Sequence, residues 1–206
     1  MAKLFSKGVA QPPANSRQLK ENTYQSSRTN LLLVVAFSVI NVVLLATGGE
    51  SYFLFSAYIP YAVVTLGMWL CGKFPTEWYG EEWADTPFLD NSFFVIMLIV
   101  AAVLIALYLL AWIFSKKRVG WLIFALVFFA VDTGAMLLMQ GISMDGILDI
   151  VFHAWVIISL VGGIRAHAEL KKFPEELVEL QQQEAQPPVV TEPTLNSEVN
   201  TDYKLN

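Results

Sequence analysis

Five long apolar runs limit what this chain can fold into. The runs are Leu31–Thr47, Tyr52–Gly72, Phe93–Phe114, Val119–Met139 and Ile142–Ile164, and none of them contains a Lys or Arg. Most reach the roughly 20 residues that a helix needs to cross a hydrocarbon core about 30 Å thick. They are apolar on nearly every face, whereas a helix of a soluble protein would carry a charged face. Barrel strands would be shorter and alternating. The sequence therefore predicts an all-α polytopic membrane helix bundle.

The basic residues stand beside the apolar runs and predict a topology. Five precede the first run, three form the cluster Lys116–Arg118 between the third and fourth runs, and Arg165, Lys171 and Lys172 follow the last run. Lys and Arg next to membrane spans favour the cytoplasmic side. Both termini and the Lys116–Arg118 loop are therefore expected on that side. An even number of crossings must then separate the N-terminus from this loop, although three apolar runs lie between them.

One run is therefore expected not to cross the membrane, and Tyr52–Gly72 is the candidate. Pro60 interrupts it, and a proline inside a helix removes a backbone hydrogen bond and kinks or breaks the helix. If this run re-enters, the acidic loop Lys73–Asn91 lies outside. We predict four crossings plus this one proline-broken re-entrant segment. The alternative is five full crossings, which places the C-terminus outside and leaves one basic group on the unexpected side.

Three segments follow from the distribution of polar residues. Residues 1–29 are polar, basic and without periodicity, and are expected to form a flexible cytoplasmic arm. Residues 30–167 form the predicted transmembrane bundle, and residues 168–206 form a polar, largely disordered cytoplasmic tail. The basic clusters suit contact with an anionic lipid leaflet, and the chain lacks a basic, aromatic-bearing soluble module for nucleic acid. A membrane-protein partner or a second copy of the chain is left open.

Four polar side chains inside the runs are candidate site residues. Asp132 lies deep in the fourth run, where an ionisable group is costly unless it is paired. Asp149 and His153 are four residues apart in the fifth run and share one helix face. Counted from the outer turn, Asp132 and His153 lie at a similar depth, roughly 13 Å, so we predict that they meet. Asn41 lies in the same outer half of the first run.

This polar level has two interpretations. In the first it is a proton-relay or cation site, in which Asp132 holds or passes charge, His153 switches near neutral pH and Asp149 forms the entrance. In the second, an Asp–His hydrogen bond only fixes the register of two helices. A water-accessible cavity at this level would distinguish the two. One histidine without recognisable ligand spacing does not predict a metal site, and no cofactor is predicted.

A second polar feature lies in the loop after the re-entrant run. It consists of Glu77, Trp78, Glu81, Glu82, Trp83 and Asp85. Because Trp prefers the membrane interface, the simpler interpretation is a short interfacial anchor. The sharper interpretation is an outer lip that binds cations or a partner, although its spacing does not match an EF-hand calcium loop.

The stretch Ser27–Leu33, continuing through Asn41 to Tyr52–Tyr61, resembles small uncharacterised membrane proteins of Gram-positive anaerobic bacteria. The resemblance covers Ser27 to His167 and implies a bacterial plasma membrane, without assigning any functional residue.

No catalytic residue is assigned either, because the chain has no nucleophile elbow, phosphate-binding loop, zinc-protease motif or dinucleotide fingerprint. The best interpretation of function is a small transport or permeation protein, or an accessory membrane subunit, that uses the intramembrane level of Asp132 and His153. The alternative is a structural or regulatory membrane protein that acts through its tails, with a purely structural Asp–His pair.

Overall fold

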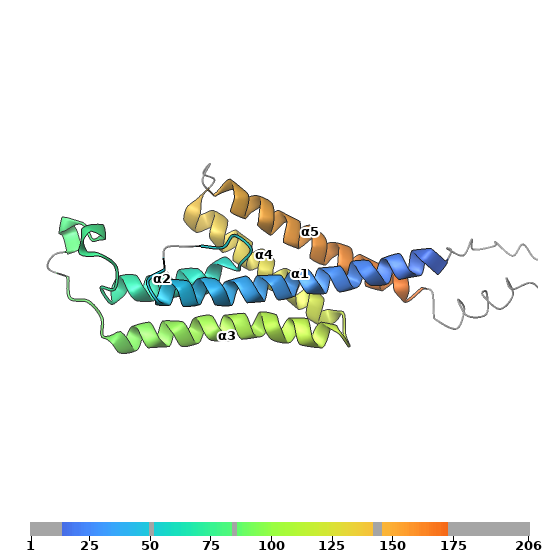
Figure 1. The fold of residues 1–206 in the computed structure, drawn as a ribbon, viewed down its shortest axis with the longest axis horizontal. Coiled ribbons are helices and arrows are strands. Elements are labelled where there is room, and N and C mark those ends of the chain that lie inside the picture. The colour runs from blue at the N-terminus through green and yellow to red at the C-terminus, as the bar shows by residue number, and fades with distance from the viewer. Residues whose placement is uncertain (1–13, 50–51, 84–85, 142–145, 173–206) are drawn as a thin grey trace, which may run out of the picture. The chain divides into compact units, whose positions relative to one another are not determined.

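The structure is a computed structural model that describes residues 14–49, 52–83, 86–141 and 146–172. Its α-helices are α1 (Ala14–Ala46), α2 (Tyr58–Leu70), α3 (Asn91–Ser115), α4 (Gly120–Gln140) and α5 (Ile147–Leu170). Two short 3₁₀ turns, η1 (Thr76–Trp78) and η2 (Glu81–Trp83), lie between α2 and α3. The described residues contain no strand, and the predicted all-α helix bundle is confirmed (Figure 1).

Four of the five helices are long and apolar enough to cross a membrane. These are α1 from Arg17 onward, α3, α4 and α5. The four candidate spans are 21 to 30 residues long. Helix α2 has only 13 residues, or about 20 Å, and is too short to cross a core about 30 Å thick. The chain is therefore a multi-pass membrane protein by the length and composition of its helices.

Helix α2 begins in the middle of the bundle and runs toward the level of the C-terminal end of α1 (Figure 1). Its first turn contacts Asp132, which is the thirteenth of the 21 residues of α4. The far end of α2 lies near the start of α3, because the N–H of Leu89 donates to the carbonyl of Leu70. The preceding residues, Tyr52–Ala57, are not helical. This is the predicted arrangement of four crossings plus one re-entrant segment.

The N-terminal end of α1, the connection between α3 and α4, and the C-terminal end of α5 lie at one end of the bundle (Figure 1). This end carries the cluster Lys116–Arg118, with Arg165 and Lys171 on the last turns of α5 and just beyond it. The described residues of the three basic groups thus share one end of the bundle, which agrees with the topology predicted from Lys and Arg.

Helix α1 begins earlier than expected, so the prediction of a flexible arm over residues 1–29 is wrong from Ala14 onward. Its polar first half packs on the bundle: the Tyr24 hydroxyl donates to the carbonyl of Ser115, and Arg28 Nε donates to Ser115 Oγ at 2.9 Å. Arg28 also donates to the carbonyl of Trp112. These bonds satisfy carbonyls at the end of α3 and hold the polar first half of α1 against the bundle. Residues 1–13 and most of the predicted tail, 173–206, lie outside the described residues.

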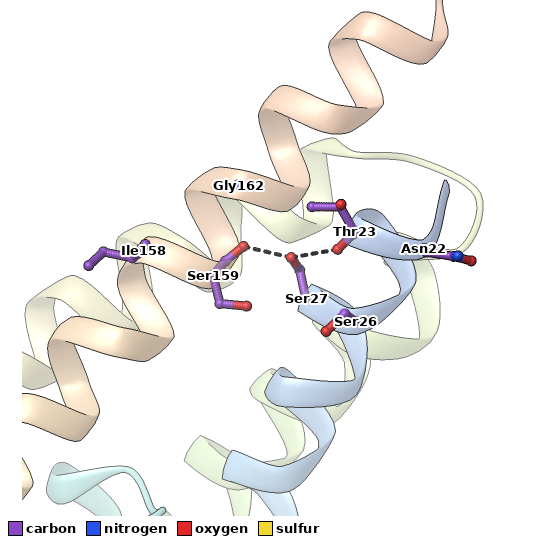
Figure 2. Close-up of a pocket in the computed structure, with 7 residues that line it drawn as sticks. All are labelled: Asn22, Thr23, Ser26, Ser27, Ile158, Ser159 and Gly162. Atoms are coloured by element: carbon purple, nitrogen blue, oxygen red, sulfur yellow. Dashed lines mark hydrogen bonds between the residues drawn. The ribbon is translucent and has the colours of Figure 1, made fainter. Parts of the chain in front are cut away.

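The polar half of α1 also packs closely against α5, as Figure 2 shows. The hydroxyl of Ser27 donates to the carbonyl of Ser159 at 2.6 Å, and Asn30 Nδ2 donates to Ser159 Oγ at 2.7 Å. A Cβ added at Gly163 would lie 2.5 Å from the Ser27 side chain. A glycine at this position therefore permits the close approach of the two helices.

Candidate functional site

The first turn of α2 lies inside the bundle, and its backbone donors are bonded by side chains from other helices. The first N–H groups of any helix have no carbonyl partner within that helix. The N–H of Ala57 donates to Ser38 Oγ of α1 at 2.8 Å. The N–H groups of Tyr58 and Ile59 donate to the two carboxylate oxygens of Asp132, each at 2.8 Å. The carboxylate of Asp132 therefore caps α2, where the positive end of the helix dipole favours a negative charge.

Pro60 completes this cap. It is the third residue of α2, a position where an N–H would have no partner within the helix, and proline has no N–H. The break in the apolar run therefore lies just before Pro60, at Ala57. The proline removes the one remaining donor of the first turn that a side chain would otherwise have to satisfy.

The non-helical segment before α2 is held by the amide of Asn41. Asn41 Oδ1 accepts from the N–H of Phe53 at 2.8 Å, and its Nδ2 donates to the carbonyl of Phe53 and to Ser56 Oγ, both at 2.7 Å. Non-helical backbone at membrane depth is tolerated only where protein or water satisfies its polar groups. The Asn41 side chain does so here, and it is 1% exposed.

Asp132 and His153 come together as their matching depth predicts. Asp132 Oδ2 lies 3.5 Å from His153 Nε2, and the two side chains are 1% and 0% exposed. On its other side, His153 Nδ1 lies 2.8 Å from the backbone carbonyl oxygen of Asp149, one turn earlier on α5. The imidazole also stacks on the ring of Phe129, with ring centres 4.9 Å apart.

These contacts give His153 and Asp132 a place for one additional proton. A carbonyl oxygen only accepts, so Nδ1 must carry a proton to bond the carbonyl of Asp149. In the neutral ring Nε2 is then an acceptor that faces a carboxylate oxygen, and two acceptors cannot bond to each other. A proton between Nε2 and Oδ2 removes this conflict, either as an imidazolium–carboxylate pair or as a carboxylic acid that donates to neutral imidazole.

Three buried polar atoms on these helices have no hydrogen-bond partner among the described residues. They are Tyr108 Oη, Asp149 Oδ1 and His153 Nε2. Buried polar atoms are rarely left unpaired, so each of these three calls for an explanation such as strain, a catalytic role or a bound water or ion. Tyr108 comes from α3, so that all four crossing helices and the re-entrant helix contribute polar atoms to the interior.

The structure therefore divides the predicted polar level into two parts. Asp132, His153 and the backbone of Asp149 lie at the first turn of α2, whereas Asn41 bonds the segment that leads into it. The sequence interpretation missed Ser38, whose only signal was a hydroxyl within an apolar run. It also missed that the main partners of Asp132 are backbone N–H groups, which no side-chain pattern reveals.

The predicted outer lip is an aromatic cluster with exposed acids beside it. Trp83 and Tyr79 pack on Trp69 of α2, with ring centres 5.9 and 4.6 Å apart, and Trp78 stacks on Phe74. Glu77 and Glu81 are exposed, nothing is described of the Glu82 side chain, and Asp85 lies outside the described residues. The aromatic packing fits the interfacial anchor. Within the described ranges, no three His, Cys, Asp or Glu side chains gather closely enough to hold a metal ion.

Three cavities bounded by described residues lie away from Asp132. One of about 450 Å³ lies between the polar ends of α1 and α5 (Figure 2) and includes Ser27, and one of about 280 Å³ lies beside Trp121. The third, of about 850 Å³, lies at the C-terminal ends of α1 and α2 and reaches Tyr61. None of the three is lined by Asp132, Asp149 or His153.

No family model, no curated protein and no solved structure matches the chain, so its function must be inferred from the geometry of its own residues.

Proposed function

We propose that this chain is a small membrane protein of the transport or permeation class, or an accessory subunit of one, in which a proton bound between Asp132 and His153 controls how firmly α2 is held. The observation that carries the proposal is the carboxylate of Asp132, which caps α2 and lies 3.5 Å from His153 Nε2. Half-helices that begin inside a membrane commonly form the ion and substrate sites of transporters. Ionisable residues at such depth commonly mark proton pathways.

The position of the proton changes the cap of α2. A proton on His153 leaves Asp132 ionised, and the carboxylate then accepts strongly from both N–H groups of α2. A proton on Asp132 neutralises the carboxylate, and hydrogen bonds to a neutral acceptor are about half as strong as those to an ionised one. Proton transfer within the pair would thus loosen or tighten the re-entrant helix, which is the element able to move without breaking a membrane crossing.

The proposed location is a plasma membrane, with both termini on the cytoplasmic side. The described residues of the three basic groups share one end of the bundle, and Lys and Arg beside spans favour the cytoplasmic face. The resemblance to membrane proteins of Gram-positive anaerobic bacteria supports a bacterial membrane.

Proton flux into vesicles tests the transport proposal. The full chain would be reconstituted into lipid vesicles that contain a trapped pH dye, and an imposed pH difference would drive protons. We expect flux above that of protein-free vesicles, and loss of that excess in Asp132→Asn and His153→Gln. Asp90→Asn, which changes an exposed acid outside the helices, is the control and should behave as the unchanged chain. Flux equal to that of empty vesicles would remove the transport proposal.

A second candidate is a structural or regulatory membrane protein that acts through its tails. It is favoured because none of the three cavities bounded by described residues is lined by Asp132, Asp149 or His153. Both oxygens of Asp132 also accept from backbone N–H groups, and the amide of Asn41 bonds the backbone of Phe53. On this interpretation, the Asp132 and His153 variants should change the stability of the protein, while the unchanged chain gives no proton flux.

A further inference from the structure

The cavity of about 850 Å³ lies where the end of α1 meets α2 and the loop that follows α2. Its volume falls within the usual range for ligand pockets, roughly 300–1,000 Å³. Apolar and aromatic side chains form much of its wall, including Leu45, Met68, Phe74 and Trp78. Such a wall suits the hydrocarbon part of a ligand. This cavity is separate from the Asp132 site, and its occupant does not depend on the function proposed for that site.

Lys73 is the one charged residue among the nine described residues that line the cavity. It is also the only Lys or Arg in the sequence between Arg28 and Lys116. In the described part of the chain no carboxylate pairs with its ammonium group, which lies 4.7 Å from the centre of the Phe94 ring. A lone cation beside an apolar wall favours a ligand that has an anionic group next to its hydrocarbon part.

The depth of the cavity matches the layers of a lipid leaflet. Tyr61, near the start of α2, and Met68, near its end, both line the cavity and are about 10 Å apart along the helix. Lys73 follows the end of α2, beside the aromatic cluster formed by Trp69 and Tyr79. Aromatic side chains gather at the level of lipid headgroups. The cation is therefore at headgroup level, and the apolar wall extends toward the level of the acyl chains.

We propose that this cavity binds an anionic phospholipid, with the headgroup phosphate at Lys73 and an acyl chain along Leu45, Met68 and Tyr61. A phospholipid supplies both the negative charge and the hydrocarbon that this arrangement favours. Free phosphate lacks the hydrocarbon, and a zwitterionic lipid offers no net charge to Lys73.

Lipid retention by the intact chain in native mass spectrometry tests the proposal. The protein in detergent would be offered phosphatidylglycerol and phosphatidylcholine with identical acyl chains. We expect phosphatidylglycerol to be retained about threefold more, the size expected of one partly exposed ion pair. Lys73→Gln should equalise the two lipids, and Lys73→Arg should keep the preference. Trp78→Ala should lower retention of both lipids, and because Trp78 is 62% exposed this change should leave the fold intact.

A matched control removes a positive charge at the other end of the bundle. Lys117→Gln, at an exposed position beside α4, should leave the preference for phosphatidylglycerol unchanged. The proposal is overturned if Lys73→Gln keeps the preference, or if Lys117→Gln removes it equally. It is also overturned if excess inorganic phosphate displaces the retained lipid completely, because the site would then recognise phosphate alone.

Discussion

Replacing Asp132 tests whether its carboxylate holds the re-entrant helix in place. Asp132→Leu removes both acceptors and leaves the buried N–H of Tyr58 and the part-buried N–H of Ile59 without partners. Each unsatisfied buried donor costs about 1–3 kcal/mol, so we expect a loss of about 2–6 kcal/mol in the free energy of unfolding. Asp132→Asn keeps one acceptor oxygen but turns an NH₂ group toward the second N–H. Its cost should be about half as large, about 1–3 kcal/mol.

Unfolding in mixed detergent micelles with increasing dodecyl sulfate, followed by far-ultraviolet circular dichroism, measures these differences. Asp90→Leu is the matched control, because Asp90 caps α3 at an exposed position by accepting from the N–H of Ser92. Its effect should be clearly smaller than that of Asp132→Leu. The reasoning is refuted if Asp132→Leu and Asp132→Asn are equally destabilising, or if neither differs from the Asp90 control.

Three further outcomes are expected. Gly163→Ala should destabilise the chain by about 1–3 kcal/mol in thermal unfolding, because the added Cβ would lie 2.5 Å from the Ser27 side chain of α1. Gly162→Ala places its Cβ in open space and should not destabilise the chain, so equal effects of the two changes would contradict this reasoning. Asn41→Leu should speed amide exchange in the segment before α2, because that segment loses its side-chain partner; unchanged exchange would contradict the role of the amide. The hydroxyl and N–H of Ser92 lower the pKa of the Asp90 carboxyl, so this cap of α3 should be present at and above the ordinary aspartate pKa and be lost only as the pH falls through the lowered value. Amide exchange at Ser92, measured against pH, checks this. Loss of the cap already at the ordinary aspartate pKa would contradict it.

The arrangement of the helices could be predicted because two independent signals agree. The lengths of the apolar runs indicate helices that span a membrane, and the positions of Lys and Arg require one run not to cross. Tyr52–Gly72 was the candidate because of Pro60, and the structure has a short re-entrant helix there. The approach of Asp132 to His153 was also predictable, because equal depth on two adjacent helices is a matter of counting residues.

The remaining features depend on tertiary contacts that a single sequence does not contain. The polar first half of α1 has partners on α3 and α5, and from the sequence alone this segment is indistinguishable from a flexible arm. The carboxylate of Asp132 accepts from the N–H of Tyr58, which lies 74 residues earlier in the sequence. Every residue except proline has a backbone N–H, so the sequence does not show which of them Asp132 binds. The sequence predicted the contact of Asp132 with His153 but not its hydrogen bonds to the N–H groups at the start of α2.

The distant origin of this cap has a consequence for how the chain is made. Tyr58 leaves the ribosome 74 residues before Asp132, which at 5–20 residues per second corresponds to roughly 4–15 seconds. During that interval the first turn of α2 has no carboxylate to accept its N–H groups, and hydrocarbon is a costly place for them. We therefore expect the re-entrant segment to wait at the membrane surface while α3 and the first half of α4 are inserted. The order of insertion thus differs from the order of synthesis, and Asp132 is the residue that ends the delay.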